Sequence, residues 1–249
     1  RSSFAKKASE SKTLFVLVAS DKGLAGAFNS SLFRKFESSF AKASEGQEKF
    51  FVAVGEKAFQ YLLKKRYNVV EKFINVGDFT TPDQVSPLTE FLIEGYLRNP
   101  STSSGQEKWD KVVVFSSHFT SALKQEPFIR EILPVDFQAI KETLEEIVPK
   151  TGKYSELIKE HGISFVSENP PTGRKEYLIE PSPKIVLENL VKHLFFMQVY
   201  HLILEANASE HSARRMAMKI ASDNALELGG ELNLQYNKSR QAAITSQII

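Results

Sequence analysis

The chain contains no cysteine among its 249 residues. This absence excludes disulfide bridges, thiolate nucleophiles and cysteine-ligated zinc. No excess of charge of one sign is present either, because 32 basic and 30 acidic residues are interspersed along the sequence. Proteins that bind nucleic acid usually concentrate a basic excess in one stretch, so we expect no nucleic-acid partner. No apolar run approaches the roughly 20 residues of a membrane span, so we expect membrane association only through another protein.

Short apolar runs alternate with helical patterns over the first half of the chain. This alternation predicts an α/β fold, with a mostly parallel, Rossmann-like sheet covered by helices on both faces. We expect this domain to span residues 13–183, after a short N-terminal segment at 1–12. Strand patterns occupy residues 13–20, 50–55, 68–76 and 111–119, and helix patterns occupy residues 30–43, 56–66 and 84–99, the first with Asn29 or Ser30 as its N-cap.

Residues 134–177 show no sustained hydrophobic period. They are rich in charges and interrupted by prolines and glycines, a composition typical of loops with short helices. A last brief strand pattern at 176–183 ends at a proline. We therefore expect an irregular segment at 134–177 within the α/β domain.

Proline is absent from residues 184–249. This segment is rich in helix formers and predicts a single C-terminal helix on the order of 100 Å long. Small and apolar residues spaced by threes and fours mark a narrow stripe, which is typical of a coiled-coil seam. Two interior glycines, Gly229 and Gly230, should soften the helix locally. The stripe consists of Ala213, Met216, Ala217, Ile220, Ala221, Ala225, Leu228 and Leu232.

The stretch SDKGLAGAFN, at residues 20–29, resembles the start of a phosphate-binding loop, because it follows an apolar strand and precedes a helix. It lacks the third glycine of the dinucleotide fingerprint and the Gly-Lys-Ser/Thr ending of a P-loop. We therefore favour a structural turn over a nucleotide site. In this interpretation Gly23 and Gly26 permit a tight turn with close packing, and Asp21 caps or pairs locally.

Three histidines on the predicted long helix, His193, His201 and His211, are interpreted as structural rather than as metal ligands. An alternative function is a small-molecule-binding α/β enzyme with a helical oligomerisation arm. Such an enzyme would need a polar cluster at the carboxyl ends of the strands. Only Asp21 with His118 suggests acid–base chemistry there.

Four motifs taken together resemble the gamma subunit of F-type ATP synthase, the central rotor shaft. They are SDKGLAGAFN, EPSP, ASEHSARRMAMKIASDNALEL and LQYNKSRQAAIT, at residues 20–29, 180–183, 208–228 and 234–245. The resemblance implies that residues 184–249 pair with an N-terminal helix in an antiparallel coiled coil. We expect this chain to lack that N-terminal helix and the last C-terminal residues.

The resemblance also implies a function by mechanical coupling, without catalytic, cofactor or metal-binding residues in this chain. The shaft would rotate within a ring of alpha and beta subunits and couple proton or sodium flow to ATP synthesis or hydrolysis on beta. Its other expected partners are the epsilon subunit and the membrane c-ring, which place it at the cytoplasmic face of a bacterial membrane or on the matrix or stroma side in an organelle. The residues expected to contact beta are Arg240, Gln241 and Thr245, with Arg214 and Lys219 as weaker candidates.

Overall fold

The computed structural model describes residues 12–40, 48–76, 80–97, 108–121, 124–135 and 180–248. The expected N-terminal segment, apart from its last residue, and almost all of the expected irregular segment at 134–177 lie outside these ranges. The described helices and strands are β1 (Lys12–Val18), α1 (Phe28–Phe40), β2 (Glu48–Val54), α2 (Glu56–Lys64), β3 (Val69–Phe73), α3 (Pro82–Leu97), β4 (Lys111–Ser121), β5 (Lys124–Leu133) and α6 (Pro183–Ile248).

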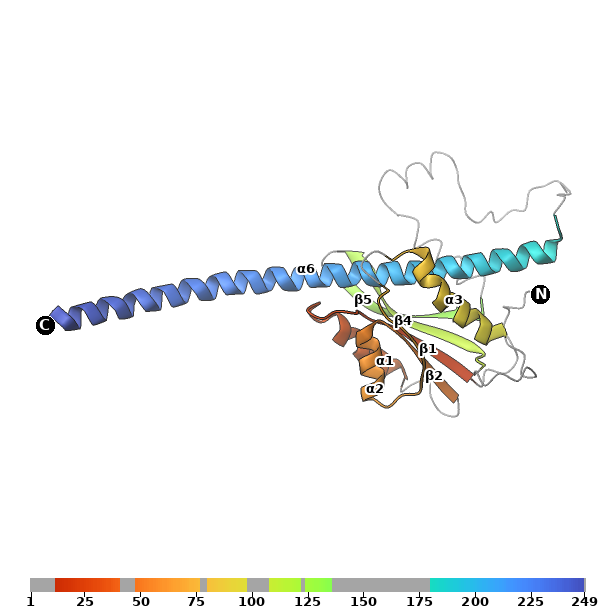
Figure 1. Cartoon of the computed structure of the whole chain (residues 1–249), viewed down its shortest axis with the longest axis horizontal. Coiled ribbons are helices and arrows are strands. Elements are labelled where there is room, and N and C mark those ends of the chain that lie inside the picture. Colours follow the sequence, from red (N-terminus) through yellow and green to blue (C-terminus); the bar gives the residue numbers. More distant parts are fainter. Residues whose placement is uncertain are drawn as a thin grey trace, which may run out of the picture.

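The five strands form one sheet in the order β3-β2-β1-β4-β5 (Figure 1). Strands β1 to β4 run parallel, with β1 in the centre between β2 and β4. The mostly parallel sheet with covering helices and a long C-terminal helix confirms the predicted fold class.

Alternating residues of the central strand face two separate cores. Phe15 and Leu17 pack with α1 and α2 on one face. Leu14 and Val16 pack with α3 and α6 on the other face. Since both faces of β1 are covered by helices, its sequence is apolar at nearly every position, as expected of a buried parallel strand.

Strand β5 was not predicted. It pairs antiparallel with β4 at the edge of the sheet, directly after a tight connection. Its sequence, KQEPFIREIL, mixes charges with apolar residues and contains Pro127, which weakens a strand pattern. Only one end of β5, at Ile132 and Leu133, is buried, so the usual signal of a buried strand is present only there.

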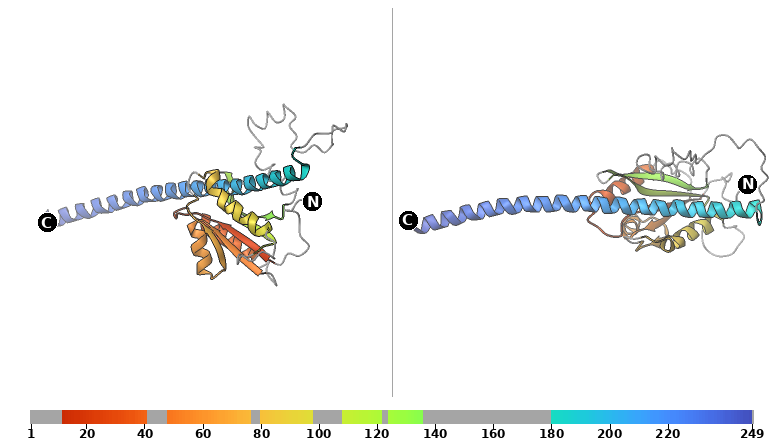
Figure 2. Two further views of the ribbon diagram at one scale, coloured as in Figure 1. Left: turned by 45° about the vertical axis from the view of Figure 1, so that its right-hand side comes forward. Right: turned by 90° about the horizontal axis from the view of Figure 1, so that it is seen from above.

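Helix α6 runs along one face of the sheet and continues far beyond the domain (Figures 1 and 2). Within its first half, Val191, Phe195, Val199 and Leu202 belong to the hydrophobic core. Residues 218–247 are all exposed and make about 45 Å of free helix. In the described part of the chain, we find no helix whose length and hydrophobicity would let it cross a membrane.

Candidate functional site

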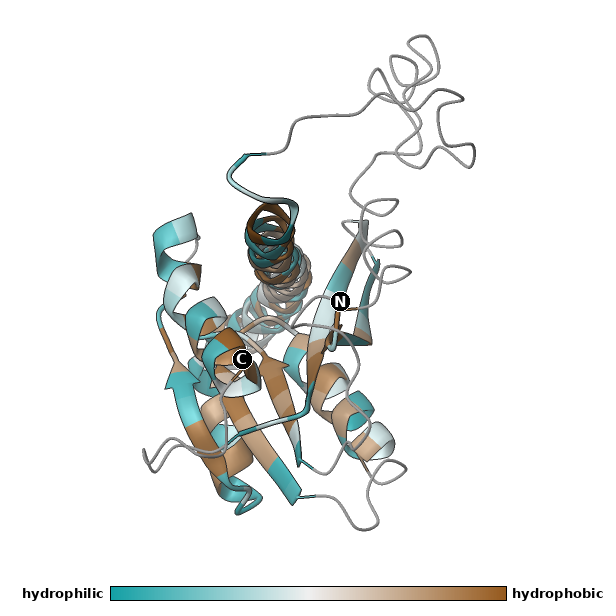
Figure 3. Ribbon diagram, turned by 90° about the vertical axis from the view of Figure 1, so that its right-hand side faces the viewer, coloured by the Kyte–Doolittle hydropathy of each residue, from teal (hydrophilic) through white to brown (hydrophobic). Residues whose placement is uncertain are grey.

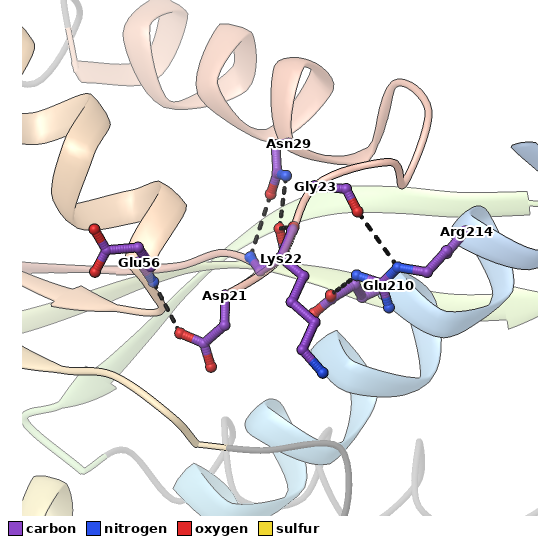
Figure 4. A network of polar contacts seen from close by, with 8 residues as sticks. Asp21, Lys22, Gly23, Asn29, Glu56, Glu210 and Arg214 are labelled. Carbon is purple, nitrogen blue, oxygen red and sulfur yellow. Dashed lines mark hydrogen bonds and ion pairs between the residues drawn. The ribbon is translucent and has the colours of Figure 1, made fainter.

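The loop after β1 lies where α6 leaves the domain, and the side chain of Asp21 bonds this loop to α2 (Figure 4). The backbone amide of Glu56 donates to Asp21 Oδ1 at 2.9 Å. Helix α2 begins after Gly55, which has no side chain to cap it. Asp21 therefore caps α2, so its partner is 35 residues away rather than local as we had expected.

Asn29 ties the far end of this loop to its beginning. Its side-chain amide donates to Ser20 Oγ at 2.7 Å, and its Oδ1 accepts from the Ser20 backbone amide at 3.2 Å. Helix α1 already begins at Phe28, so neither Asn29 nor Ser30 is the N-cap that the sequence suggested. The Asn29 side chain closes the loop instead.

Of the two loop glycines, Gly26 adopts a left-handed conformation with φ of 58°, and a Cβ built on it would lie 3.6 Å from Ala217 of α6. It thus permits the turn, whereas 3.6 Å is an ordinary van der Waals distance, so the packing of α6 does not itself require a glycine there. Gly23 has no positive φ, and a Cβ there would meet nothing within 4 Å, so neither expected constraint applies to it.

The loop is bonded directly to α6 through Arg214. The Arg214 Nε–H donates to the Gly23 carbonyl oxygen at 3.4 Å. The same guanidinium forms an ion pair with Glu210, one turn earlier on the helix. The Arg214 side chain is only 21% exposed, so this residue binds within the chain.

A cavity of about 140 Å³ lies between the carboxyl ends of β1 and β2 and helix α6. Open α/β sheets bind ligands at this edge, but sites for drug-sized ligands usually have about 300–1,000 Å³. The Lys57 amide donates to the Ser20 carbonyl, and Asp21 already accepts from α2. These polar groups of the loop therefore bond to α2, and Ser20 also bonds to Asn29, which favours the structural interpretation of SDKGLAGAFN over a nucleotide site.

The acid–base pair considered for an enzyme does not form. His118 Nδ1 pairs with Glu205 Oε1 of α6 at 2.9 Å, whereas Asp21 caps α2. His201 Nε2 lies 3.5 Å from the same Glu205 oxygen, one turn along the helix. Within the described ranges, no cluster of three or more His, Asp or Glu side chains could hold a metal ion. His118 thus links β4 to α6, whereas His201 pairs within α6.

The first half of the predicted stripe on α6 lies beside the domain. Ala213, Met216, Ala217 and Ile220 line a groove of about 480 Å³ that the β1–α1 loop and the β4–β5 hairpin complete. These four residues therefore face the domain, and the groove keeps them only partly covered. Because the groove leaves these residues partly exposed, their assignment to a second helix stays a prediction.

A longer line of exposed apolar residues shares Ala225 and Leu232 with this stripe and extends towards the start of α6. Leu190, Met197, Leu204, Met218 and Leu232 are spaced at multiples of seven, and each is at least 38% exposed. A repeat of seven with large apolar residues is the pattern of a coiled-coil seam. We call this line the heptad seam; Ala225, Gly229 and Tyr236 continue it at coiled-coil positions.

The residues predicted to contact a beta subunit lie in two environments. Arg240, Gln241 and Thr245 lie on the free part of α6, all exposed, and the Thr245 hydroxyl donates to the Gln241 carbonyl oxygen at 2.8 Å. Lys219 is also exposed, whereas Arg214 is bound to the β1–α1 loop. The first three lie on a part of the helix that nothing else in the described chain covers.

An α/β domain that carries a long helix, half of it outside any core, defines a class of proteins that work as subunits of larger assemblies. The family model for ATP synthase matches residues 1–249. The ATP synthase gamma chain of Herpetosiphon aurantiacus is 33% identical over 238 residues, covering 95% of this chain and 70% of its own length. That of Prochlorococcus marinus (strain MIT 9303) is 32% identical, covering 98% and 75%. The chain belongs to the ATP synthase gamma chain family.

Solved structures agree on the fold. The rotor of the Euglena gracilis mitochondrial ATP synthase matches 97% of this chain with a TM-score of 0.61 and 16% identity, over 81% of its own chain. The central stalk of the Tetrahymena thermophila mitochondrial enzyme matches 88% with a TM-score of 0.56 and 21% identity, over 80% of its own chain. At these identities the likeness concerns the fold alone.

Proposed function

We propose that this chain is the central stalk of an F-type ATP synthase and rotates within the ring of alpha and beta subunits. The observation that carries the proposal is helix α6, which is clamped in the α/β domain over its first half and fully exposed over residues 218–247. A shaft needs one end fixed and one end free to contact changing partners. Its asymmetric faces would drive each beta catalytic site through open and closed states in turn.

The free half of α6 supplies the contacts to beta in this proposal. Arg240, Gln241 and Thr245 project from three neighbouring positions near its end. Arginine forms bidentate bonds to carboxylates, and glutamine adds a donor and an acceptor. Such contacts must break once per step, so modest and exchangeable polar bonds suit a rotor better than one large apolar contact.

The heptad seam would bind a second helix, and in the gamma family this is the N-terminal helix. A single helix of about 45 Å bends easily, so a paired helix supplies the stiffness that torque requires. Gly229 lies on the seam, where the lack of a side chain allows the partner backbone to approach closely. Pairing would also offset the local softness of the two glycines.

The remaining partners follow from the same role. The epsilon subunit and the membrane c-ring would bind the opposite end of the molecule from the free helix, and ion flow through the c-ring would turn the stalk. The chain would thus be peripheral to the energy-coupling membrane, at the cytoplasmic face in a bacterium or on the matrix or stroma side in an organelle. The small-molecule enzyme is less supported, because His118 and Asp21 are engaged elsewhere.

The double variant Arg240→Ala with Gln241→Ala tests the proposal. In a complex assembled with alpha and beta subunits, and with the family's N-terminal helix joined to the chain, we expect ATP-driven rotation to slow by about tenfold or more. The reason is that hydrogen bonds to charged groups contribute about 1.5–3 kcal/mol each. Rotation would be followed with a probe attached to the α/β domain.

The matched control is Gln235→Ala with Lys238→Ala, which removes a glutamine and a cation from the same region of exposed helix. The isolated double variants should unfold at the same urea concentration as the parent, since neither pair touches the domain. Full coupled activity of the Arg240/Gln241 variant would contradict the assignment of these residues. Failure of the parent chain to join any hydrolytic complex would contradict the rotor function itself.

A further inference from the structure

Two lines of polar contacts hold α6 in the domain, one on each side of its buried face. On the first side, the Tyr200 hydroxyl donates to the Thr80 carbonyl oxygen at 3.1 Å, and Asn207 Nδ2 donates to Thr80 Oγ1 at 2.6 Å. Arg214 continues this line to the Gly23 carbonyl oxygen. Since these three helix residues are seven apart, they follow one side of α6.

The second line contacts the β4–β5 hairpin. Glu205 pairs with His118, and the buried Ser209 hydroxyl donates to the Ser117 carbonyl oxygen at 3.4 Å. Gln125 Nε2 donates to the Ser212 hydroxyl oxygen at 3.4 Å. The view from above in Figure 2 shows α6 running between α3 and the β4–β5 hairpin. The groups that bond to the two lines therefore lie on opposite sides of the helix.

These six residues surround the end of the buried part of the helix. At about 100° per residue, the two lines lie about half of the helix circumference apart, with the apolar face between them. Figure 3, which looks along α6, shows the domain beneath the helix, with α3 and the hairpin on its two sides. We call Tyr200, Glu205, Asn207, Ser209, Ser212 and Arg214 the collar.

We propose that the collar fixes the rotational position of α6 in the α/β domain and is the structure through which torque passes between them, an inference that rests on the rotor function proposed above. Apolar burial is non-directional, so the buried face of α6 resists separation more than it resists small rotations. Hydrogen bonds are directional and short-ranged. Rotating the helix by about 10° moves a group at its surface, about 5–6 Å from the axis, by about 1 Å, which breaks such a bond.

The position of the collar along α6 also fits this role. The collar ends at Arg214, and the fully exposed part of the helix begins at Met218. A lever loaded at its free end carries its largest bending moment where it leaves its support. Contacts on both sides of the helix oppose rotation in either direction, as a shaft that works in both synthesis and hydrolysis requires.

Thr80 binds two collar residues, Tyr200 through its backbone carbonyl oxygen and Asn207 through its hydroxyl oxygen. Two nearly isosteric changes test the second contact directly, because one removes the hydroxyl oxygen and the other keeps it. Thr80→Val removes the oxygen that accepts from Asn207 and keeps the shape, whereas Thr80→Ser keeps the oxygen. A second test combines Tyr200→Phe with Asn207→Ala, and its control is Asn224→Ala with Asn233→Ala on the free helix, away from the heptad seam. The chain has no native cysteine, so spin labels can be attached at Leu63→Cys in α2 and Ser222→Cys beyond the collar without background labelling.

In the assembled complex, we expect Thr80→Val and the Tyr200/Asn207 variant to broaden the distance distribution between the two labels. Hydrogen exchange of backbone amides next to the collar should quicken by about fivefold, the loss of one net hydrogen bond of about 1 kcal/mol. The ratio of ATP-driven ion pumping to ATP hydrolysis should fall, whereas hydrolysis itself continues. Thr80→Ser and the control should match the parent in all three measurements.

Parent-like distances and a parent-like pumping ratio in both collar variants would overturn the proposal, because the apolar face alone would then fix the helix. Failure of the parent complex to hydrolyse ATP would count against the rotor function instead. The label distances in the isolated full chain test the collar independently of that outcome. If the double variant does not fold, the comparison of Thr80→Val with Thr80→Ser decides, since each changes a single side-chain group.

Discussion

Gly95 is a position where the core leaves no room for a side chain. It lies in α3 beneath the buried ring of Trp109, and a Cβ built on it would be 1.9 Å from Trp109 Cζ2. The ring is held there by its Nε1–H, which donates to the Leu92 carbonyl oxygen at 3.1 Å. We expect Gly95→Ala to destabilise the protein by about 1–3 kcal/mol through overpacking.

Trp109 is the single tryptophan of the chain, so its fluorescence during urea unfolding measures this effect directly. The matched control is Gly230→Ala on the free helix, where a Cβ meets nothing within 4 Å. A parent-like urea midpoint for Gly95→Ala would mean that the ring moves aside at little cost and that the packing argument is wrong.

Glu37 of α1 makes stability depend on acid pH. Its carboxylate accepts hydrogen bonds from Lys65, which directly follows α2, and from Tyr61 of α2. The bond to Lys65 is the main cause, and that to Tyr61 the second, that holds the pKa of this carboxyl below its ordinary value of 4.5. The ionised form is therefore favoured in the folded state. Its contribution to stability is present above that ordinary pKa and is lost as pH falls through the lower pKa of the folded protein.

We expect Glu37→Gln to lower the urea midpoint slightly at pH 7 and by a smaller amount at a pH below 4.5, where part of the stabilisation by the ionised carboxyl is lost. The effect is small because the side chain is 45% exposed and solvent screens the pair. Glu71→Gln on the sheet edge, where the carboxylate bonds only to the adjacent Lys72 amide, serves as control. An equal effect of Glu37→Gln at both pH values would rule out the ion pair as its cause.

Sequence reasoning predicted the type of the 20–29 loop but not the partners of its residues. Gly26 and the structural nature of the turn followed from local chemistry, because a left-handed turn favours glycine. The pairing of Asp21 with α2, and of Arg214 with Gly23, joins residues 35 and 191 positions apart. No local pattern encodes such contacts, since they depend on how the elements pack.

At the scale of the element, Gly229 and Gly230 make α6 locally less stable than the turns of helix on either side of them. Both glycines lie in the helix interior with open space around them, and each costs about 1 kcal/mol relative to alanine. We expect Gly230→Ala to slow hydrogen exchange of the surrounding amides by about fivefold in the isolated chain. Mass spectrometry of peptides that cover residues 222–236 would measure the change.

Comparing Gly229→Ala with Gly230→Ala distinguishes the effect of helix propensity from the effect of pairing with a second helix. In the isolated chain Gly229→Ala should slow exchange as Gly230→Ala does. Once the N-terminal helix of the family is supplied, Gly229→Ala should weaken its binding, because this residue lies on the heptad seam and Gly230 does not. Equal effects of the two substitutions on binding would place the seam on another face.

Most elements were predicted within two or three residues of their observed ends, because apolar periodicity reports burial directly. The strand at residues 13–20 was correct because both of its faces are covered. Strand β5 was missed because an edge strand buries little. The length of α6 was predicted from the absence of proline over residues 184–249, whereas the family resemblance came from the residue order of four motifs, which packing rules alone do not supply.

At the scale of the whole molecule, the structure predicts that stability and function separate along α6. The described contacts between this helix and the domain all lie before residue 221, whereas Arg240, Gln241 and Thr245 lie beyond it. A chain that ends at Ile220 should keep its free energy of unfolding within about 0.5 kcal/mol of the parent, as surface changes do. The same chain should lose coupled activity in the assembled complex.

A chain that ends at Gln198 provides the contrast, because it also loses the collar and the buried Leu202 and Ile203. Burial of each of these side chains contributes about 1.5–3 kcal/mol, so we expect a loss of at least about 3 kcal/mol or no cooperative unfolding. Urea titrations followed by Trp109 fluorescence compare the three chains. If ending the chain at Ile220 lowers stability by more than about 1 kcal/mol, the free helix supports the domain, and the division of α6 into a clamped base and a free shaft is wrong.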